Sequence, residues 1–182
     1  KASSRPTIPP ASARSALSVS SCRTSRSREA PSALRIAISL PRAAARERSQ
    51  EQLRIAAETG AHPLRFPGHQ MLGRVELAAG DLAAARRSLE TALEESAAAG
   101  EHLRTRAVEA DLARVELAEG RAEEAARRAG ETAGWCRQRG IPLCEALALS
   151  VQCEARAEQG RGAEARAAAE RIRVLIRRGE DR

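Results

Sequence analysis

The sequence predicts an all-α fold, a solenoid of antiparallel helix pairs, from three observations. Glycines recur at a spacing of 40 residues, in one phase at Gly80, Gly120 and Gly160 and in another at Gly60, Gly100 and Gly140. The segment 72–78 returns at 112–118 with six of seven residues identical. The apolar residues are mostly Ala and Leu, and the only aromatic residues are Phe66 and Trp135, a composition that favours closely packed helices over a sheet. A fixed period of this length is typical of stacked structural repeats.

Each 40-residue unit has the pattern of a helix, a glycine break, a second helix and a second break. In the first unit Leu82, Ala85 and Leu89 recur at spacings of three and four, which places them on one helix face. Gly80 suits the left-handed position that ends a helix, and Asp81 suits the N-cap of the next. The sequence therefore predicts helix pairs at 67–79 with 82–98, 103–119 with 122–138, and 143–159 with 162–178.

The chain divides into three predicted regions. Residues 61–182 form the repeats of period 40, and residues 31–60 form a degenerate leading helix pair. In that pair the two helices would be 30–39 and 42–58, with Pro41 opening the second, where a first helical turn accepts proline. Residues 1–30 are rich in Ser, Arg, Pro and Ala and are predicted to be a disordered basic tail or linker. The same composition fits an organelle transit peptide, or DNA translated in the wrong frame.

The basic charge of the chain is confined to its start. The net charge is +7, but residues 1–50 carry ten basic and two acidic residues, whereas residues 51–182 carry 21 basic and 22 acidic residues. The repeats are thus close to neutral, and we expect nucleic acid to bind only non-specifically, through the basic tail. No apolar run is long enough for a membrane span, so we expect no membrane partner.

The first unit, from Leu72 to Leu93, resembles the tetratricopeptide repeat (TPR) family. Leu72-Gly73, Gly80-Asp81, Ala85, Leu89 and Ala92-Leu93 occupy the family's characteristic places in order. The second unit retains Leu112, Ala113, Gly120 and Ala125, and the third retains Gly160 and Ala165. The period is 40 rather than the family's 34 residues, and the usual aromatics and helix-ending proline are missing. Long repeats of this type look like the helical arms of large bacterial regulators and kinases. The resemblance implies a right-handed superhelix.

The resemblance also implies a site. In TPR proteins the first helix of each pair lines the concave face, and the matching positions here are Gln70, Arg74, Leu77, Ala110, Arg114, Leu117, Ser150, Glu154 and Ala157. The candidate partner-binding residues are Gln70, Arg74, Arg114, Ser150 and Glu154. Arg74 and Arg114 stand one repeat apart, where guanidinium groups could bind a carboxylate of an acidic peptide. The alternative is that both are solvated helix charges, paired with Glu76, Glu116 or other neighbours.

No catalytic or metal-binding pattern is found, so we expect no enzyme, no cofactor and no metal. Cys22, Cys136, Cys144 and Cys153 lack metal-ligand spacing and are predicted to be small thiols in a reducing, cytoplasmic compartment. His62 and His102 recur with the repeat, and His69 stands alone. Gly160-Arg161-Gly162 is a helix break, because no strand precedes it as a phosphate-binding loop requires. Trp135 is predicted to anchor the packing of the second pair.

The predicted function is a protein–protein interaction or scaffolding module. We expect it to be the C-terminal regulatory arm of a larger bacterial signalling or transcription-regulating protein, with a protein or peptide partner. The bacterial origin is indicated by the preference for Arg, since Lys1 is the only lysine among 31 basic residues, as a GC-rich genome would produce. The alternative from another class is an arm that senses a small molecule and controls an attached ATPase, kinase or transcription activator.

Overall fold

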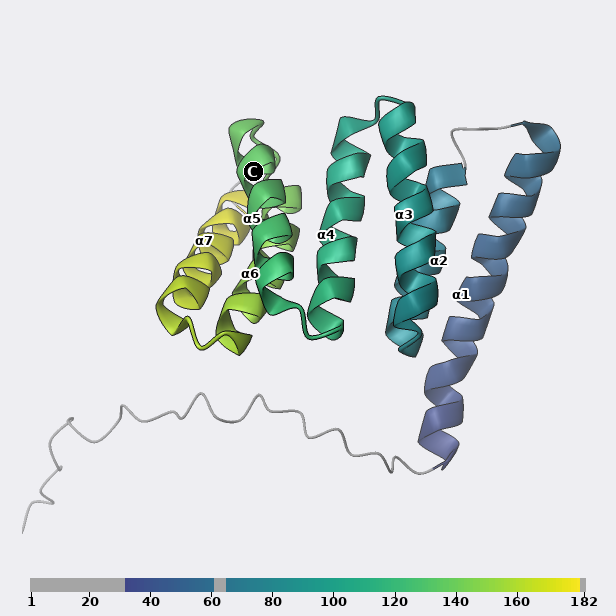
Figure 1. The fold of residues 1–182 in the computed structure, drawn as a ribbon, viewed down its shortest axis with the longest axis horizontal. Coiled ribbons are helices and arrows are strands. Elements are labelled where there is room, and N and C mark those ends of the chain that lie inside the picture. The colour runs from purple at the N-terminus through teal and green to yellow at the C-terminus, as the bar shows by residue number, and fades with distance from the viewer. Residues whose placement is uncertain (1–31, 61–64, 181–182) are drawn as a thin grey trace, which may run out of the picture. The chain divides into compact units, whose positions relative to one another are not determined.

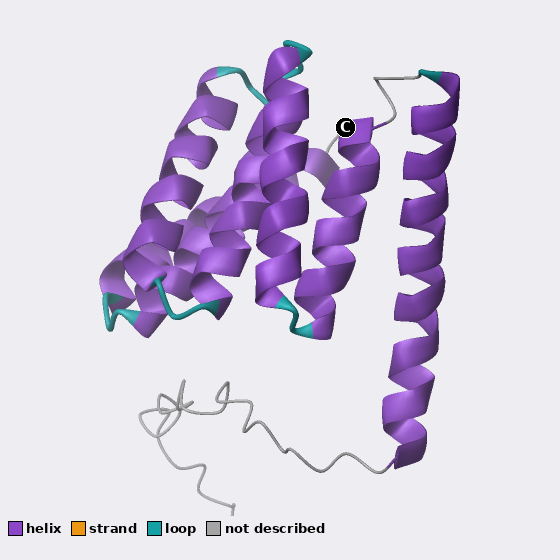
Figure 2. Cartoon of the chain, turned by 45° about the vertical axis from the view of Figure 1, so that its right-hand side comes forward, coloured by secondary structure: helices purple, strands orange, loops and turns teal. Residues whose placement is uncertain are grey.

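The computed structural model describes residues 32–60 and 65–180, and this part of the chain is all-helical, as predicted (Figures 1 and 2). The residues of the predicted tail, 1–30, lie outside the described residues, as do 61–64 and 181–182. Within the described ranges the helices are α1 (Ser32–Thr59), α2 (Arg65–Ala79), α3 (Leu82–Ala98), α4 (His102–Ala118), α5 (Ala122–Gln138), α6 (Pro142–Glu158) and α7 (Gly162–Glu180).

The three predicted helix pairs are confirmed, with boundaries within two residues of the prediction. The first helices of the pairs are α2, α4 and α6, and the second helices are α3, α5 and α7. The predicted leading pair is wrong, because α1 is a single helix that continues through Pro41. The segment Ser32–Thr59 contains no glycine at which the chain could take a left-handed turn, and Pro41 alone does not end the helix.

The helix ends are set by glycine turns of one repeated form. Gly80 has φ +85°, a left-handed conformation that residues with a Cβ rarely adopt. The next amide, Asp81 N–H, donates to the carbonyl of Glu76 at 3.0 Å, as in the Schellman motif. The carboxylate of Asp81 then accepts from Ala84 N–H at 3.0 Å, which confirms its predicted role as N-cap. The same hydrogen bond, from a backbone N–H to the carbonyl five residues earlier, is made by the amides of Glu101, Arg121, Ile141 and Arg161.

The chain divides into two units, residues 1–37 and residues 38–182. The described residues of the first are the start of α1. In the second unit each helix from α2 to α7 packs against the next, and the first helices also contact one another, α2 with α4 and α4 with α6. This contact between first helices of successive pairs brings equivalent positions of the repeat side by side.

The core consists of several small clusters rather than one large one. Between α3 and α4 it is formed by Ala85, Leu89, Ala92, Val108, Leu112 and Val115. Further along, Ala133, Ala148, Leu149, Ala168 and Leu175 join α5, α6 and α7. Alanine buries little apolar area, so close approach of the helices must supply much of the contact. Gly73 permits such an approach, because a Cβ added there would lie 2.6 Å from Cγ of Leu89.

The cysteines depart from the prediction of thiols. Cys136 near the end of α5 and Cys144 in α6 form a disulfide across the turn between the two helices, with their Cα atoms 5.9 Å apart. Their spacing of eight residues has no significance along one helix, but the turn at Gly140 folds the two positions together. Cys153 is a free, half-buried thiol, which donates to the carbonyl of Ala165 at 3.3 Å.

Among the described helices, none combines the length and the apolar character that crossing a membrane requires.

Candidate functional site

Three of the five predicted site residues converge on one buried carboxylate that the sequence analysis did not single out. Arg74 Nε and Gln70 Nε2, both from α2, donate to Oδ2 of Asp111 at 2.7 and 2.8 Å. Arg114, one turn after Asp111 in α4, donates through Nη1 to Oδ1 at 3.0 Å. Asp111 is only 1% exposed. The structure therefore brings Gln70, Arg74 and Arg114 together through a shared acceptor across the α2–α4 contact.

The charges in this cluster do not balance, since two guanidinium groups share one carboxylate. The side chains of Arg74 and Arg114 are 42% and 36% exposed, so both reach solvent. Each uses one nitrogen for Asp111 and has two more nitrogens in its planar fork. Asp111 thus orients two cationic forks at the surface without neutralising both of them. Such a pair of arginines can donate hydrogen bonds to an additional carboxylate from a binding partner.

The other two predicted residues lie on α6 and do not join this cluster in the described structure. Ser150 donates its hydroxyl proton to the carbonyl of Leu147 in its own helix at 2.7 Å, and Glu154 is exposed. Three neighbouring positions that the family pattern places on the face are turned inward. Leu77 and Leu117 pack against core clusters, and Ala110 is buried. Of these three, Ala110 is buried, whereas Leu77 and Leu117 are half-buried and share their apolar surface with the core.

The first helices also carry exposed apolar side chains near the predicted site residues, and the sequence analysis did not identify them. Leu143 and Leu147 of α6 are 72% and 44% exposed, and Leu103 of α4 and Met71 of α2 are exposed to a similar degree. A signal was available, because Leu103 and Leu143 are 40 residues apart and Leu147 follows Leu143 by one helical turn. We call the following set the first-helix face: Gln70, Met71, Arg74, Leu103, Arg114, Leu143, Leu147, Ser150 and Glu154.

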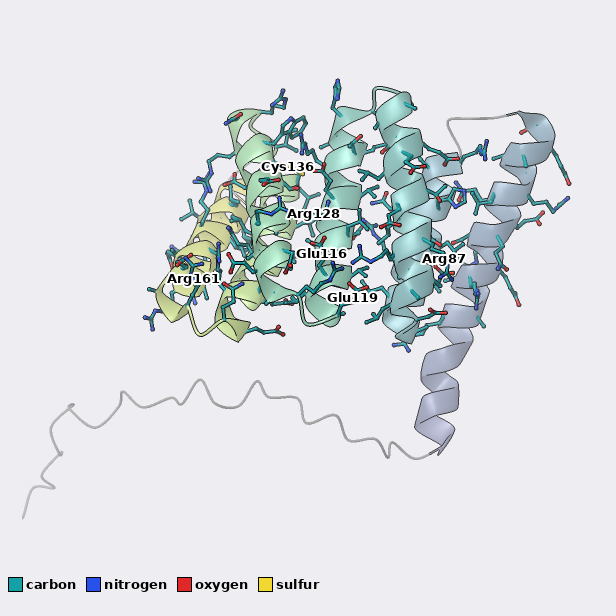
Figure 3. All side chains as sticks on the ribbon, viewed as in Figure 1. Arg87, Glu116, Glu119, Arg128, Cys136 and Arg161 are labelled. Carbon is teal, nitrogen blue, oxygen red and sulfur yellow. A yellow bond between two sulfur atoms is a disulfide. The ribbon has the colours of Figure 1, made fainter. Side chains whose placement is uncertain are left out.

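Two buried acidic residues of the first helices, Glu76 and Glu116, are bonded to the second helix of their own pair. Arg128 of α5 donates through Nε and Nη2 to the buried carboxylate of Glu116 in α4, at 2.8 to 3.1 Å (Figure 3). These bonds, with the attraction of Glu116, raise the pKa of Arg128 above its ordinary value despite partial burial. Glu76 of α2 instead accepts from the hydroxyl of Ser88 at 2.7 Å. Both acids join the two helices of a pair, and we assign them a structural role.

Another buried acid, Glu145, joins three helices. Arg137 of α5 donates to Glu145 Oε1 at 2.8 Å, and Arg171 of α7 donates to both carboxylate oxygens, at 2.8 and 3.1 Å. Burial of Glu145 opposes its ionisation, but hydrogen bonds from Arg171 and Arg137, together with their charges, hold its pKa below the ordinary value. Glu145 is therefore an anion held between two cations.

The described histidines and the tryptophan do not form part of a catalytic or metal-binding group within the described ranges. His69 Nε2 lies 4.0 Å from a carboxylate oxygen of Glu95, His102 is the exposed first residue of α4, and His62 lies outside the described residues. In the described ranges no group of three or more His, Cys, Asp or Glu side chains could hold a metal ion. Trp135 is half-buried, and its ring lies between the guanidinium carbons of Arg106 and Arg139, at 5.6 and 4.1 Å from the centroid.

Comparison with known proteins adds no assignment, because no protein-family model matches the sequence and no curated protein matches it either.

Proposed function

We propose that this chain is a protein-interaction module of the tetratricopeptide type, a right-handed superhelical arm whose first-helix face binds a segment of a protein partner. The observation that carries the proposal is the exposure of Leu103 and Leu143 at equivalent positions of successive repeats, together with Leu147 one turn after Leu143. Exposed leucines that align along one face are costly in water unless a partner covers them. The contact of α4 with α6 supports a continuous face rather than isolated side chains.

The charge of the α2–α4 part of this face selects the chemistry of the partner segment that binds there. Arg74 and Arg114 carry one more positive charge than Asp111 neutralises, and Asp111 holds them in place before any partner arrives. A segment that combines apolar side chains with a carboxylate is therefore the partner that fits. We further propose that the module serves as the regulatory or scaffolding arm of a bacterial signalling or transcription-regulating protein. The predicted cytoplasmic location is not part of this proposal, since disulfides such as Cys136–Cys144 are rare in reducing compartments.

The test is a selection of displayed peptides on the full chain. The peptides that bind should carry leucine-like side chains near an Asp or Glu. Their affinity, measured by calorimetry, should fall at least about tenfold for Leu143→Gln/Leu147→Gln and also for Arg74→Gln/Arg114→Gln, as expected when a central contact is removed. Arg87→Gln, which changes an exposed arginine of the second helix α3, is the matched control and should bind as the parent does. Peptides whose affinity is the same for all of these variants would contradict the proposal.

A further inference from the structure

A cavity of about 240 Å³ lies between α5, α6 and α7, away from the first-helix face. Its walls carry three guanidinium groups, one carboxylate and one amide, and two alanines of α7 and one leucine of α6 complete the lining. The lining residues that matter here are Arg137, Gln152, Arg156, Glu164, Ala168 and Arg171. Its volume is below the roughly 300–1,000 Å³ of pockets for drug-sized ligands, so a smaller ligand is the relevant one.

The cavity lies where the third repeat departs from the first two. Glu76 faces Ser88 in the first pair, and Glu116 faces Arg128 in the second. The equivalent residues of the third pair are Arg156 and Ala168. The acid of the first helix has become a base, and the polar residue of the second helix has become a methyl group. The internal pair is lost and space is left in its place.

A second replacement in the third repeat puts a polar residue, Gln152, in the α6 wall of the cavity. Gln152 lies 40 residues after Leu112, which is buried in the α3–α4 core, and 80 residues after Leu72. Its amide packs on Gly130 of α5, where an added Cβ would lie 2.7 Å from Nε2. A polar side chain at a core position, beside a glycine that gives it room, is not what packing alone would favour.

Arg156 is the least solvated cation of the cavity. Its side chain is 14% exposed and forms ion pairs with Glu164 at 3.3 Å and Glu123 at 3.4 Å, both at the surface. Its buried Nε lies 3.3 Å from Oε2 of Glu164 without the geometry of a hydrogen bond, whereas its Nη1 donates to Gln159 at 2.8 Å. An incompletely satisfied buried guanidinium is unfavourable, and an additional acceptor in the cavity would relieve it.

The charges around the cavity favour an anion. Arg137 and Arg171 both donate to Glu145, so one carboxylate serves two cations and holds their forks in position. The ion pairs around the site join four guanidinium groups to three carboxylates, because Arg161 shares Glu123 and Glu164 with Arg156. Planar forks of this kind match the oxygen atoms of phosphate and carboxylate groups.

We propose that this cavity binds a small oxyanion, the phosphate or carboxylate group of a small molecule, with Arg156 as its main ligand and Arg137 and Arg171 in support. The site does not depend on the proposed protein-binding function, because none of its lining residues belongs to the first-helix face. It gives the chain a place where a small anionic molecule could stabilise the packing of α7 on α5 and α6.

The experiment titrates the full chain with inorganic phosphate and, separately, with succinate, at an ionic strength held constant with chloride. Calorimetry and the unfolding midpoint are the readouts. Binding of at least one anion, with a midpoint above that in chloride alone, is the expected result, and the stronger of the two identifies phosphate or carboxylate chemistry. Arg156→Gln should weaken that binding at least about tenfold, and Arg166→Gln, an exposed arginine of α7, should leave it unchanged.

A second variant keeps the test decisive if Arg156→Gln does not fold. Arg156→Glu/Ala168→Arg rebuilds the Glu116–Arg128 pair of the second repeat in the third, so it should fill the cavity, keep the helical circular dichroism and bind neither anion. The proposal is overturned if neither anion binds the parent chain beyond the effect of chloride. It is equally overturned if a folded variant lacking Arg156 binds as tightly as the parent.

Discussion

The pairs Gly73–Leu89, Ala113–Ala129 and Cys153–Ala169 occupy one equivalent place in the three repeats. Where the first helix has no Cβ, the second supplies a leucine, and Leu89 is fully buried against Gly73. Where the first helix carries alanine or cysteine, the second carries only alanine. The two helices thus change size in opposite directions, which avoids a steric clash at this place, although the side-chain volume of the pair is smaller in the second and third repeats.

This compensation predicts a strong coupling between residues 73 and 89. Gly73→Ala should destabilise the chain by about 1–3 kcal/mol, because its Cβ would overlap Leu89, although alanine favours helix formation. Leu89→Ala should cost about 2–5 kcal/mol by leaving a cavity. The double variant copies the second repeat, so it should cost clearly less than the sum of the two single changes. Urea unfolding of the four proteins measures this, and strictly additive values would refute the compensation.

Asp111 illustrates where residue-by-residue reading of the sequence fails. The arginines around it were predicted from their places in the repeat, but an acid buried at a position facing another repeat has no local signature. Only the contact of α2 with α4 brings Arg74 within 2.7 Å of it, 37 residues away in sequence. Leu143 could have been recognised from its period, whereas Asp111 could not.

The helices themselves were predictable where their ends carry chemical signals. Gly80, Asp81 and Pro142 each act at the end for which their backbone preferences suit them, and every helix from α2 to α7 begins or ends beside such a residue or a glycine. The prediction of two helices in place of α1 was wrong because the signals for a helix end are weak there. Pro41 alone is a weak signal without a glycine before it, so the helix continues where a break was predicted.

Glu145 makes the packing of α5, α6 and α7 dependent on pH. Because its pKa is lowered on folding from an ordinary value of 4.5, its contribution is present above that value and is lost as the pH falls below it. Glu145→Gln should therefore lower stability by about 1–3 kcal/mol near neutral pH, and the difference from the parent should shrink between about pH 5 and pH 3. Thermal unfolding across this range is the measurement.

The control for this pH dependence is Glu170→Gln, which removes an exposed acid paired with the exposed Arg173 on α7. A surface pair of this kind contributes about 0–1 kcal/mol, so its variant should stay close to the parent throughout. A constant difference between Glu145→Gln and the parent down to about pH 3 would mean that the Arg137–Glu145–Arg171 cluster does not titrate as described.

Charge along the chain predicts that any affinity for nucleic acid resides in its first 30 residues. They hold six basic residues and one acidic residue, so their deletion lowers the net charge from +7 to +2. Binding of a random DNA duplex should weaken steeply with added salt and be lost in the truncated chain, because phosphate contacts release counterions. Retention of the binding by residues 31–182 would place a basic surface on the helices instead, contrary to their balanced charge.

The first-helix face can be tested as a binding surface by mapping backbone amide chemical shifts while a selected peptide is added to the full chain. We expect the largest changes on the face residues of α2, α4 and α6, around Arg74, Leu103, Arg114, Leu143 and Leu147. Changes confined to the second helices, or to residues 1–30, would contradict it.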